Sequence, residues 1–110
     1  MFGNKLNKIP KMMEKNQADK LEALLKDKDA QVRLAAIDAL GQCKGDAAFN
    51  ALVPLLNSPD ADVREHGAHA LGAMGLPKAR TFLLHRKAEE KEDKVLKAIA
   101  DALGHIEVKV

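Results

Sequence analysis

A unit of 31 to 32 residues occurs three times in this 110-residue chain, and this repetition constrains the fold more than any other feature. The clearest marker is a Leu-Gly pair, which recurs at Leu40-Gly41, Leu71-Gly72 and Leu103-Gly104. The similarity extends upstream of the pair, so that segments 29–41, 60–72 and 92–104 align without a gap. Units this short cannot bury an apolar face alone, and they must therefore stack on one another.

The apolar residues of each unit follow a helical period. In the first copy they are Val32, Ala35, Ala36, Ala39, Leu40 and Cys43. These positions form one stripe on a 3.6-residue period, and the small residues within it favour a close approach by a neighbouring helix. Gly67 stands on the same stripe in the second copy, where the sister units have Ala36 and Ile99, and it predicts a tight contact. An acid opens each copy and suits a helix N-terminus, namely Asp29, Asp60 and Glu92.

A second helical pattern precedes each of these helices. Apolar residues recur at helical spacing over 18–25 and again over 49–56. The links 27–29 and 57–60 are short and rich in turn-forming residues, which favours an antiparallel helix pair. The sequence therefore predicts an all-α chain of helical hairpins.

These motifs resemble the HEAT repeat, in the short bacterial and archaeal form called the phycobilisome-lyase-type HEAT-like repeat. The resemblance rests on Asp29 with Val32-Arg33 and Ala39-Leu40-Gly41, and on their counterparts Asp60, Val63-Arg64 and Ala70-Leu71-Gly72. It implies a right-handed α-solenoid of about three hairpins over 18–110, with repeats at about 18–45, 46–76 and 77–107. The third copy departs from the pattern, because Leu96 replaces the arginine and Arg86-Lys87 replaces a leucine pair.

Segment 1–17 is expected to cap the first hairpin. Phe2, Leu6, Ile9 and Met13 are spaced as on a short amphipathic helix, which Pro10 should end or restart. Two interpretations of its lysines stay open, a solvated cap face or a basic binding arm, and the residues concerned are Lys5, Lys8, Lys11 and Lys15.

The resemblance also implies a role for Arg33 and Arg64. In HEAT-like repeats this arginine reaches across the turn to an acid or a free carbonyl of an adjacent repeat, which a planar guanidinium with five donors can do. Recognition of a substrate or phosphate is the alternative.

Composition excludes several classes of protein. The net charge of +2 and the absence of Trp and Tyr argue against a nucleic-acid partner. No apolar stretch approaches the roughly 18 residues of a membrane span, and no signal-peptide pattern opens the chain. Cys43 is the single cysteine and belongs to the apolar stripe, so we expect a buried filler in a cytoplasmic protein.

Recognisable enzyme motifs are absent from the sequence, which has no phosphate-binding glycine loop and no paired-cysteine metal motif. One constellation, Glu65 with His66 and His69, resembles the His-Glu iron ligands of deoxyhypusine hydroxylase, a HEAT-like enzyme, although the order is reversed. We expect a half-buried His66, an exposed His69, no metal and no cofactor. The competing hypothesis is a metal- or tetrapyrrole-linked enzyme or accessory subunit related to HEAT-like lyases or hydroxylases.

The function we predict is a non-catalytic scaffold that binds a protein partner. Exposed positions that do not repeat, on the second helices and a concave face, are the candidates for specificity: Leu34, Asp38, Glu65, His69, Lys97 and Asp101. The C-terminal end is the other candidate surface, for the partner or for a homodimer. There we expect Val95, Ala98 or Ile99, and Ile106 to lie bare, unless Ile106, Val108 and Val110 fold back as a cap.

Overall fold

The computed structural model describes residues 4–106, and within that range the chain forms seven α-helices, one 3₁₀ helix and no strand. The elements are α1 (Asn4–Glu14), α2 (Ala18–Leu24), α3 (Ala30–Leu40), α4 (Asp46–Leu52), the 3₁₀ helix η1 (Val53–Asn57), α5 (Ala61–Met74), α6 (Ala79–Glu89) and α7 (Asp93–Ile106).

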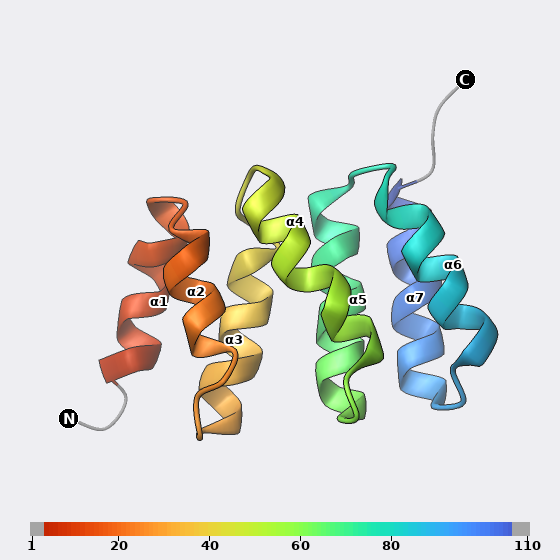
Figure 1. The fold of residues 1–110 in the computed structure, drawn as a ribbon, viewed down its shortest axis with the longest axis horizontal. Helices are drawn as coiled ribbons and strands as arrows, with labels where there is room; N and C mark the ends of the chain where they lie inside the picture. Colours follow the sequence, from red (N-terminus) through yellow and green to blue (C-terminus); the bar gives the residue numbers. More distant parts are fainter. Residues whose placement is uncertain (1–3, 107–110) are drawn as a thin grey trace.

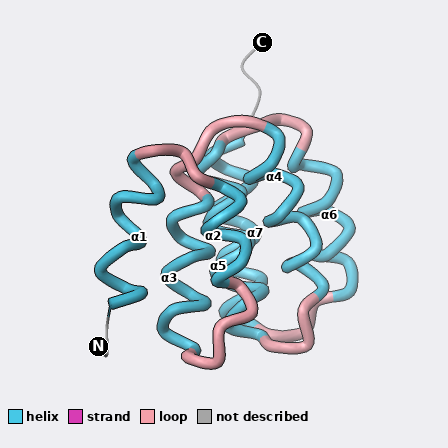
Figure 2. Tube along the Cα trace, turned by 60° about the vertical axis from the view of Figure 1, so that its left-hand side comes forward, coloured by secondary structure: helices cyan, strands magenta, loops and turns pink. Residues whose placement is uncertain are grey.

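The helices are arranged in two layers (Figure 1). Helices α3, α5 and α7 stand side by side in one layer, with α1 continuing the row beyond α3, and α2, α4 with η1, and α6 form the other. Each hairpin joins a helix of one layer to a helix of the other through a short loop (Figure 2). The described chain is elongated, with extents of 45 × 30 × 17 Å. The predicted all-α fold of stacked helical hairpins is confirmed.

Repetition in the sequence becomes repetition in the core. Leu21, Leu52 and Leu83 lie 31 residues apart, one in the first helix of each hairpin, and all three are fully buried. A single cluster of buried side chains runs from Ile9 to Ile106 through all three hairpins. Each unit therefore buries its apolar stripe against its neighbours, as a repeat architecture requires.

Helix starts repeat as well. Asp29 and Asp60 are N-caps, as predicted, and accept hydrogen bonds from the backbone N–H of Gln31 (2.9 Å) and Asp62 (2.8 Å). A further cap lies two residues before each helix-opening acid. There the side chains of Asp27, Ser58 and Glu90 accept the backbone N–H of residues 29, 60 and 92.

Two glycines set the spacing between hairpins. A Cβ built on Gly41 would lie 2.9 Å from the Cα of Ala70, and one on Gly72 would lie 2.7 Å from the Cα of Ala102. The equivalent Gly104 has nothing within 4 Å among the described atoms. Gly67 is buried, as expected, and a Cβ there would lie 3.2 Å from the Cβ of Leu55. In the first two copies, the Leu-Gly signature thus marks positions where a backbone approaches an alanine on the next hairpin.

The effect of Pro10 differs from the prediction that it ends or restarts the N-terminal helix. Pro10 lies inside α1 and does not end it, because the helix is held by packing of Ile9 into the core and of Leu6 and Met13 against it. The tertiary contacts outweigh the lost backbone hydrogen bond. Pro54, in contrast, lies at the start of η1, where the second hairpin's first helix continues as a 3₁₀ helix.

The expected bare apolar residues at the C-terminal end are not bare. Val95, Ala98 and Ile99 are fully buried and Ile106 is 2% exposed, because α7 packs this face against α5 and α6. That prediction was wrong, since it treated a stripe that faces the previous hairpin as one that faces outward. Val108 and Val110 lie outside the described residues, and the homodimer stays a prediction.

Candidate functional site

The six side chains predicted to carry specificity lie on α3, α5 and α7, in one layer of the fold (Figure 1). We call their surface the α3–α5–α7 face. Asp38, His69, Lys97 and Asp101 are exposed, whereas Leu34 and Glu65 are half-buried.

The structure brings some of these residues together. His69 and Asp101 line one shallow hollow between α5 and α7, together with Ala100, Gly104 and His105. Asp38 lies apart from them, in a second hollow between α1 and α3 whose other lining residues include Ile9, Met13 and Gln42. The face therefore offers two separate depressions, one with an acid and two histidines and one with an acid beside apolar side chains.

Polar links cross this face from helix to helix. The Nδ1 of His66 lies 2.9 Å from a carboxylate oxygen of Asp38, which joins α5 to α3. Lys94 of α7 forms an ion pair with Asp62 of α5. The hydrogen bond and charge of Asp62 raise the pKa of Lys94, and the same contact lowers the pKa of Asp62. Both links bridge exposed or half-exposed groups, so they contribute little free energy.

The two arginines of the Val-Arg motif have structural partners. Arg33 donates to the backbone carbonyl of Asp27 (2.7 Å), and Arg64 donates to that of Ser58 (2.7 Å). Both carbonyls belong to the arginine's own hairpin, so the expected tie to an adjacent repeat was wrong for Arg33. Arg64 does make such a tie, with its Nε and Nη2 donating to the Glu90 carboxylate at 2.9 and 3.1 Å.

Glu90 is the one buried charged residue of the described chain. Burial by itself raises the pKa of Glu90, but hydrogen bonds from Arg64 and from the Glu92 N–H, with the charges of Arg64 and Arg86, bring it below the ordinary value. The second guanidinium, on Arg86, has its Nε 3.2 Å from the carboxylate. This arrangement is a tie between hairpins, because all its partners lie at the joint between the second and the third.

No three His, Cys, Asp or Glu side chains within residues 4–106 come together closely enough to hold a metal ion. His66 is half-buried and turned to Asp38, and His69 is exposed, as predicted. Cys43 is buried, also as predicted, and burial raises the pKa of its thiol. A raised thiol pKa disfavours the nucleophilic thiolate.

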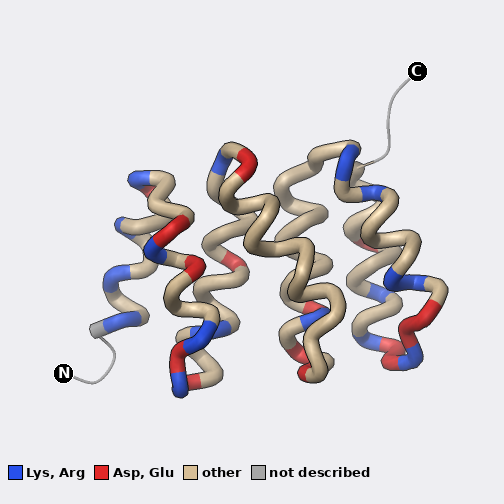
Figure 3. The backbone as a smooth tube through the Cα atoms, viewed as in Figure 1, with Lys and Arg blue, Asp and Glu red and all other residues tan. Residues whose placement is uncertain are grey.

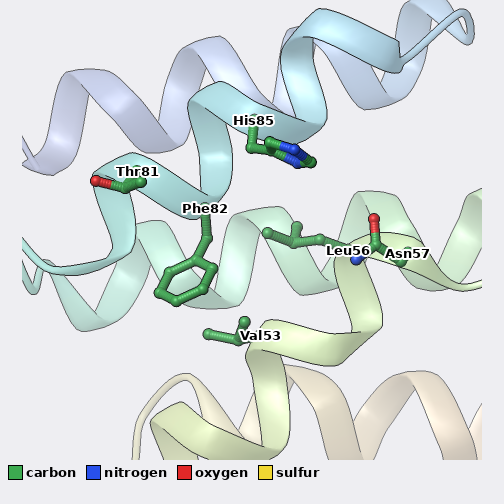
Figure 4. Close-up of a pocket in the computed structure, with 6 residues that line it drawn as sticks. All are labelled: Val53, Leu56, Asn57, Thr81, Phe82 and His85. Carbon is green, nitrogen blue, oxygen red and sulfur yellow. The ribbon is translucent and has the colours of Figure 1, made fainter.

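Sequence reasoning missed a hollow of about 300 Å³ in the other layer, between η1 and α6 (Figure 4). Its lining residues are Val53, Leu56, Asn57, Thr81, Phe82 and His85. Phe82 is 44% exposed and packs edge-on against Phe49, with ring centroids 6.1 Å apart. No repeat or motif in the sequence pointed to this hollow, because it lies between helices of two different hairpins.

The comparison with known families decides what kind of chain this is. The family model described as HEAT repeats matches residues 18–104, which span all three hairpins. This chain belongs to the HEAT-repeat family. The match is to HEAT repeats in general, so the narrower phycobilisome-lyase-type form stays a prediction. No curated protein matches this HEAT-repeat chain significantly. None of its helices within the described residues is long and apolar enough to cross a membrane.

Proposed function

We propose that this HEAT-repeat protein is a non-catalytic scaffold, in which exposed side chains of the α3–α5–α7 face bind a segment of a partner protein. HEAT repeats generally mediate protein–protein interaction. A partner-binding surface on a repeat fold needs positions that lie outside the buried core and that differ from one repeat to the next.

One observation carries the proposal. The buried positions of α3, α5 and α7 hold only alanine, valine, leucine, isoleucine and glycine, but the positions on the α3–α5–α7 face change their chemistry from copy to copy. Half-buried Leu34 and Glu65 and exposed Lys97 are aligned and are apolar, acidic and basic, and the exposed, aligned positions 38, 69 and 101 hold Asp, His and Asp. Such variation within a strict repeat gives each point along the row its own contact chemistry.

The test is affinity capture from native lysate with three baits. These are the wild type, the triple variant Asp38→Ala/His69→Ala/Asp101→Ala, and a control triple variant Glu22→Ala/His85→Ala/Glu89→Ala. Both triples remove two acids and one histidine from exposed positions, but the control changes only α2 and α6. We expect a protein retained by the wild type and the control and lost with the first triple. Equal retention by all three baits, at unchanged helicity and melting temperature, would place binding elsewhere on the molecule.

A further inference from the structure

A second surface, distinct from the α3–α5–α7 face, lies at the other side of α1. A hollow of about 410 Å³ opens between α1 and the start of α2. The face of α1 that carries Ile9 and Met13 is turned to α3, so this hollow lies on the remaining faces of α1. We call it the basic cleft.

Four lysines line the basic cleft. Lys8 and Lys11 lie on α1 and Lys15 directly follows its last residue, and their spacings of three and four residues put them on one side. Lys20 of α2 lies opposite. Basic positions follow one another along α1, whereas α2 carries both basic and acidic ones (Figure 3).

These charges are free in the part of the chain that is described. None of the four lysines is within ion-pair distance of a carboxylate there, whereas Lys5, Lys78 and Lys94 each pair with an aspartate. Glu14 and Asp19 are neighbours in sequence but do not line the cleft. The residues that line the hollow thus include four lysines and no acid.

The remaining lining residues add hydrogen-bonding and apolar groups to the basic cleft. Asn7 and Gln17 supply side-chain amides, which donate and accept hydrogen bonds, and Met12 supplies a half-buried, adaptable apolar contact. We propose that the basic cleft binds an acidic, Asp- or Glu-rich segment of a partner protein. Carboxylates would meet the lysines, and the segment's backbone and apolar stems would meet the amides and Met12.

Acidic protein fits this surface better than nucleic acid does. The cleft has no arginine to form bidentate contacts with phosphate and no aromatic side chain on which a base could stack. Lysines are compact point charges on flexible stems, which adapt to single carboxylates.

The test measures binding of a fluorescein-labelled oligoglutamate peptide by fluorescence anisotropy, at low and at physiological salt. The variant is Lys8→Gln/Lys11→Gln/Lys15→Gln. Its control, Lys26→Gln/Lys87→Gln/Lys91→Gln, removes the same charge from exposed lysines outside the cleft. We expect the first variant to lose about tenfold in affinity and the control to stay within about twofold, because three ion pairs of ordinary strength are removed. The affinity of the wild type should fall as salt rises.

Three results would overturn the proposal. Equal losses in the two variants would mean that net charge alone attracts the peptide. A single-stranded oligonucleotide or an anionic vesicle that binds more tightly than the peptide, with the same dependence on Lys8, Lys11 and Lys15, would assign the cleft to that partner instead. No measurable peptide binding by the wild type at low salt would leave the cleft without its proposed ligand. Circular dichroism checks that each variant keeps its helical content. Neither variant changes the α3–α5–α7 face, so this experiment leaves the proposed scaffold function to its own test.

Discussion

At the scale of single residues, the distance between neighbouring hairpins depends on two glycines, which have no side chain. Gly41 and Gly72 leave room for Ala70 and Ala102, and the backbones approach closely at both joints. The sequence shows the Leu-Gly recurrence but not its reason, because only the structure places each glycine opposite an alanine some 30 residues further along.

Gly72 and Gly104 are a matched pair for testing this. Gly72→Ala puts a methyl group 2.7 Å from the Ala102 Cα, so we expect a loss of about 1–3 kcal/mol in the free energy of unfolding. Gly104→Ala meets nothing in the described chain, and the better helix former should add about 0.5–1 kcal/mol. Urea denaturation measures both. Equal changes in the two variants would show that helix propensity, and not the joint, governs these positions.

Glu90 is a further residue on which a joint depends. Sequence reasoning did not single it out, because the unit gains a residue between Leu83 and Glu90 and its pairing with Arg64 is visible only in three dimensions. The aligned cap residues Asp27 and Ser58 were missed for a similar reason, since their partners are backbone groups.

The pH dependence of stability should report Glu90. Its folded-state pKa lies below the ordinary value of 4.5, so the ionised carboxylate stabilises the fold above that pH and the contribution is lost as the pH falls through the folded-state pKa. We expect Glu90→Gln to cost about 2–3 kcal/mol near neutral pH and progressively less below about pH 4.5. Urea titrations from about pH 3 to pH 7 measure this, and a cost that does not change with pH would contradict it.

At the scale of elements, the periodic helices were predictable, but the effect of the prolines inside them was not. Helices α3 and α5 follow from a clear stripe and an acidic cap, and the structure confirms both. The outcome at Pro10 depended on how firmly Ile9 is buried, and the 3₁₀ helix after α4 depended on where Pro54 falls in the hairpin. Local helix propensity predicts neither outcome, because tertiary contacts decide whether a helix continues through a proline.

Replacing Pro10 tests whether packing holds α1 together despite the proline. Pro10 is exposed and lies inside the helix, so Pro10→Ala restores a backbone donor without disturbing the core. We expect the free energy of unfolding to rise by about 1–3 kcal/mol, with a higher melting temperature. A lower melting temperature would mean that the proline itself shapes the contact between α1 and α3.

At the scale of the whole molecule, the sequence predicted exposed positions on α3, α5 and α7 but not where the surface is hollowed. Positions 38, 69 and 101 are exposed as the helical phase required. The basic cleft lies between the N-terminal helix α1 and the first repeat, and the hollow beside Phe82 lies between the second and third repeats, so no single helical pattern contains them. The buried face of α7 was misjudged for the same reason, since phase alone does not tell which neighbour a stripe meets.

A metal titration separates the scaffold from the competing metal-linked enzyme. If Glu65, His66 and His69 form no site, Zn²⁺ or Fe²⁺ should leave the melting temperature of the purified protein within about one degree, because a ligand stabilises a fold only by binding its native state. A rise of several degrees that disappears in His66→Ala would support the metal-linked alternative.

Photo-crosslinking tests the proposed binding face most directly. A photoreactive amino acid is placed at position 69, on the α3–α5–α7 face, or at position 84, where Leu84 is exposed on α6 in the other layer. Each variant is irradiated in native lysate, and crosslinked proteins are identified by mass spectrometry. We expect one partner to crosslink from position 69 and not from position 84. The same partner crosslinking from position 84 alone would contradict the proposed face.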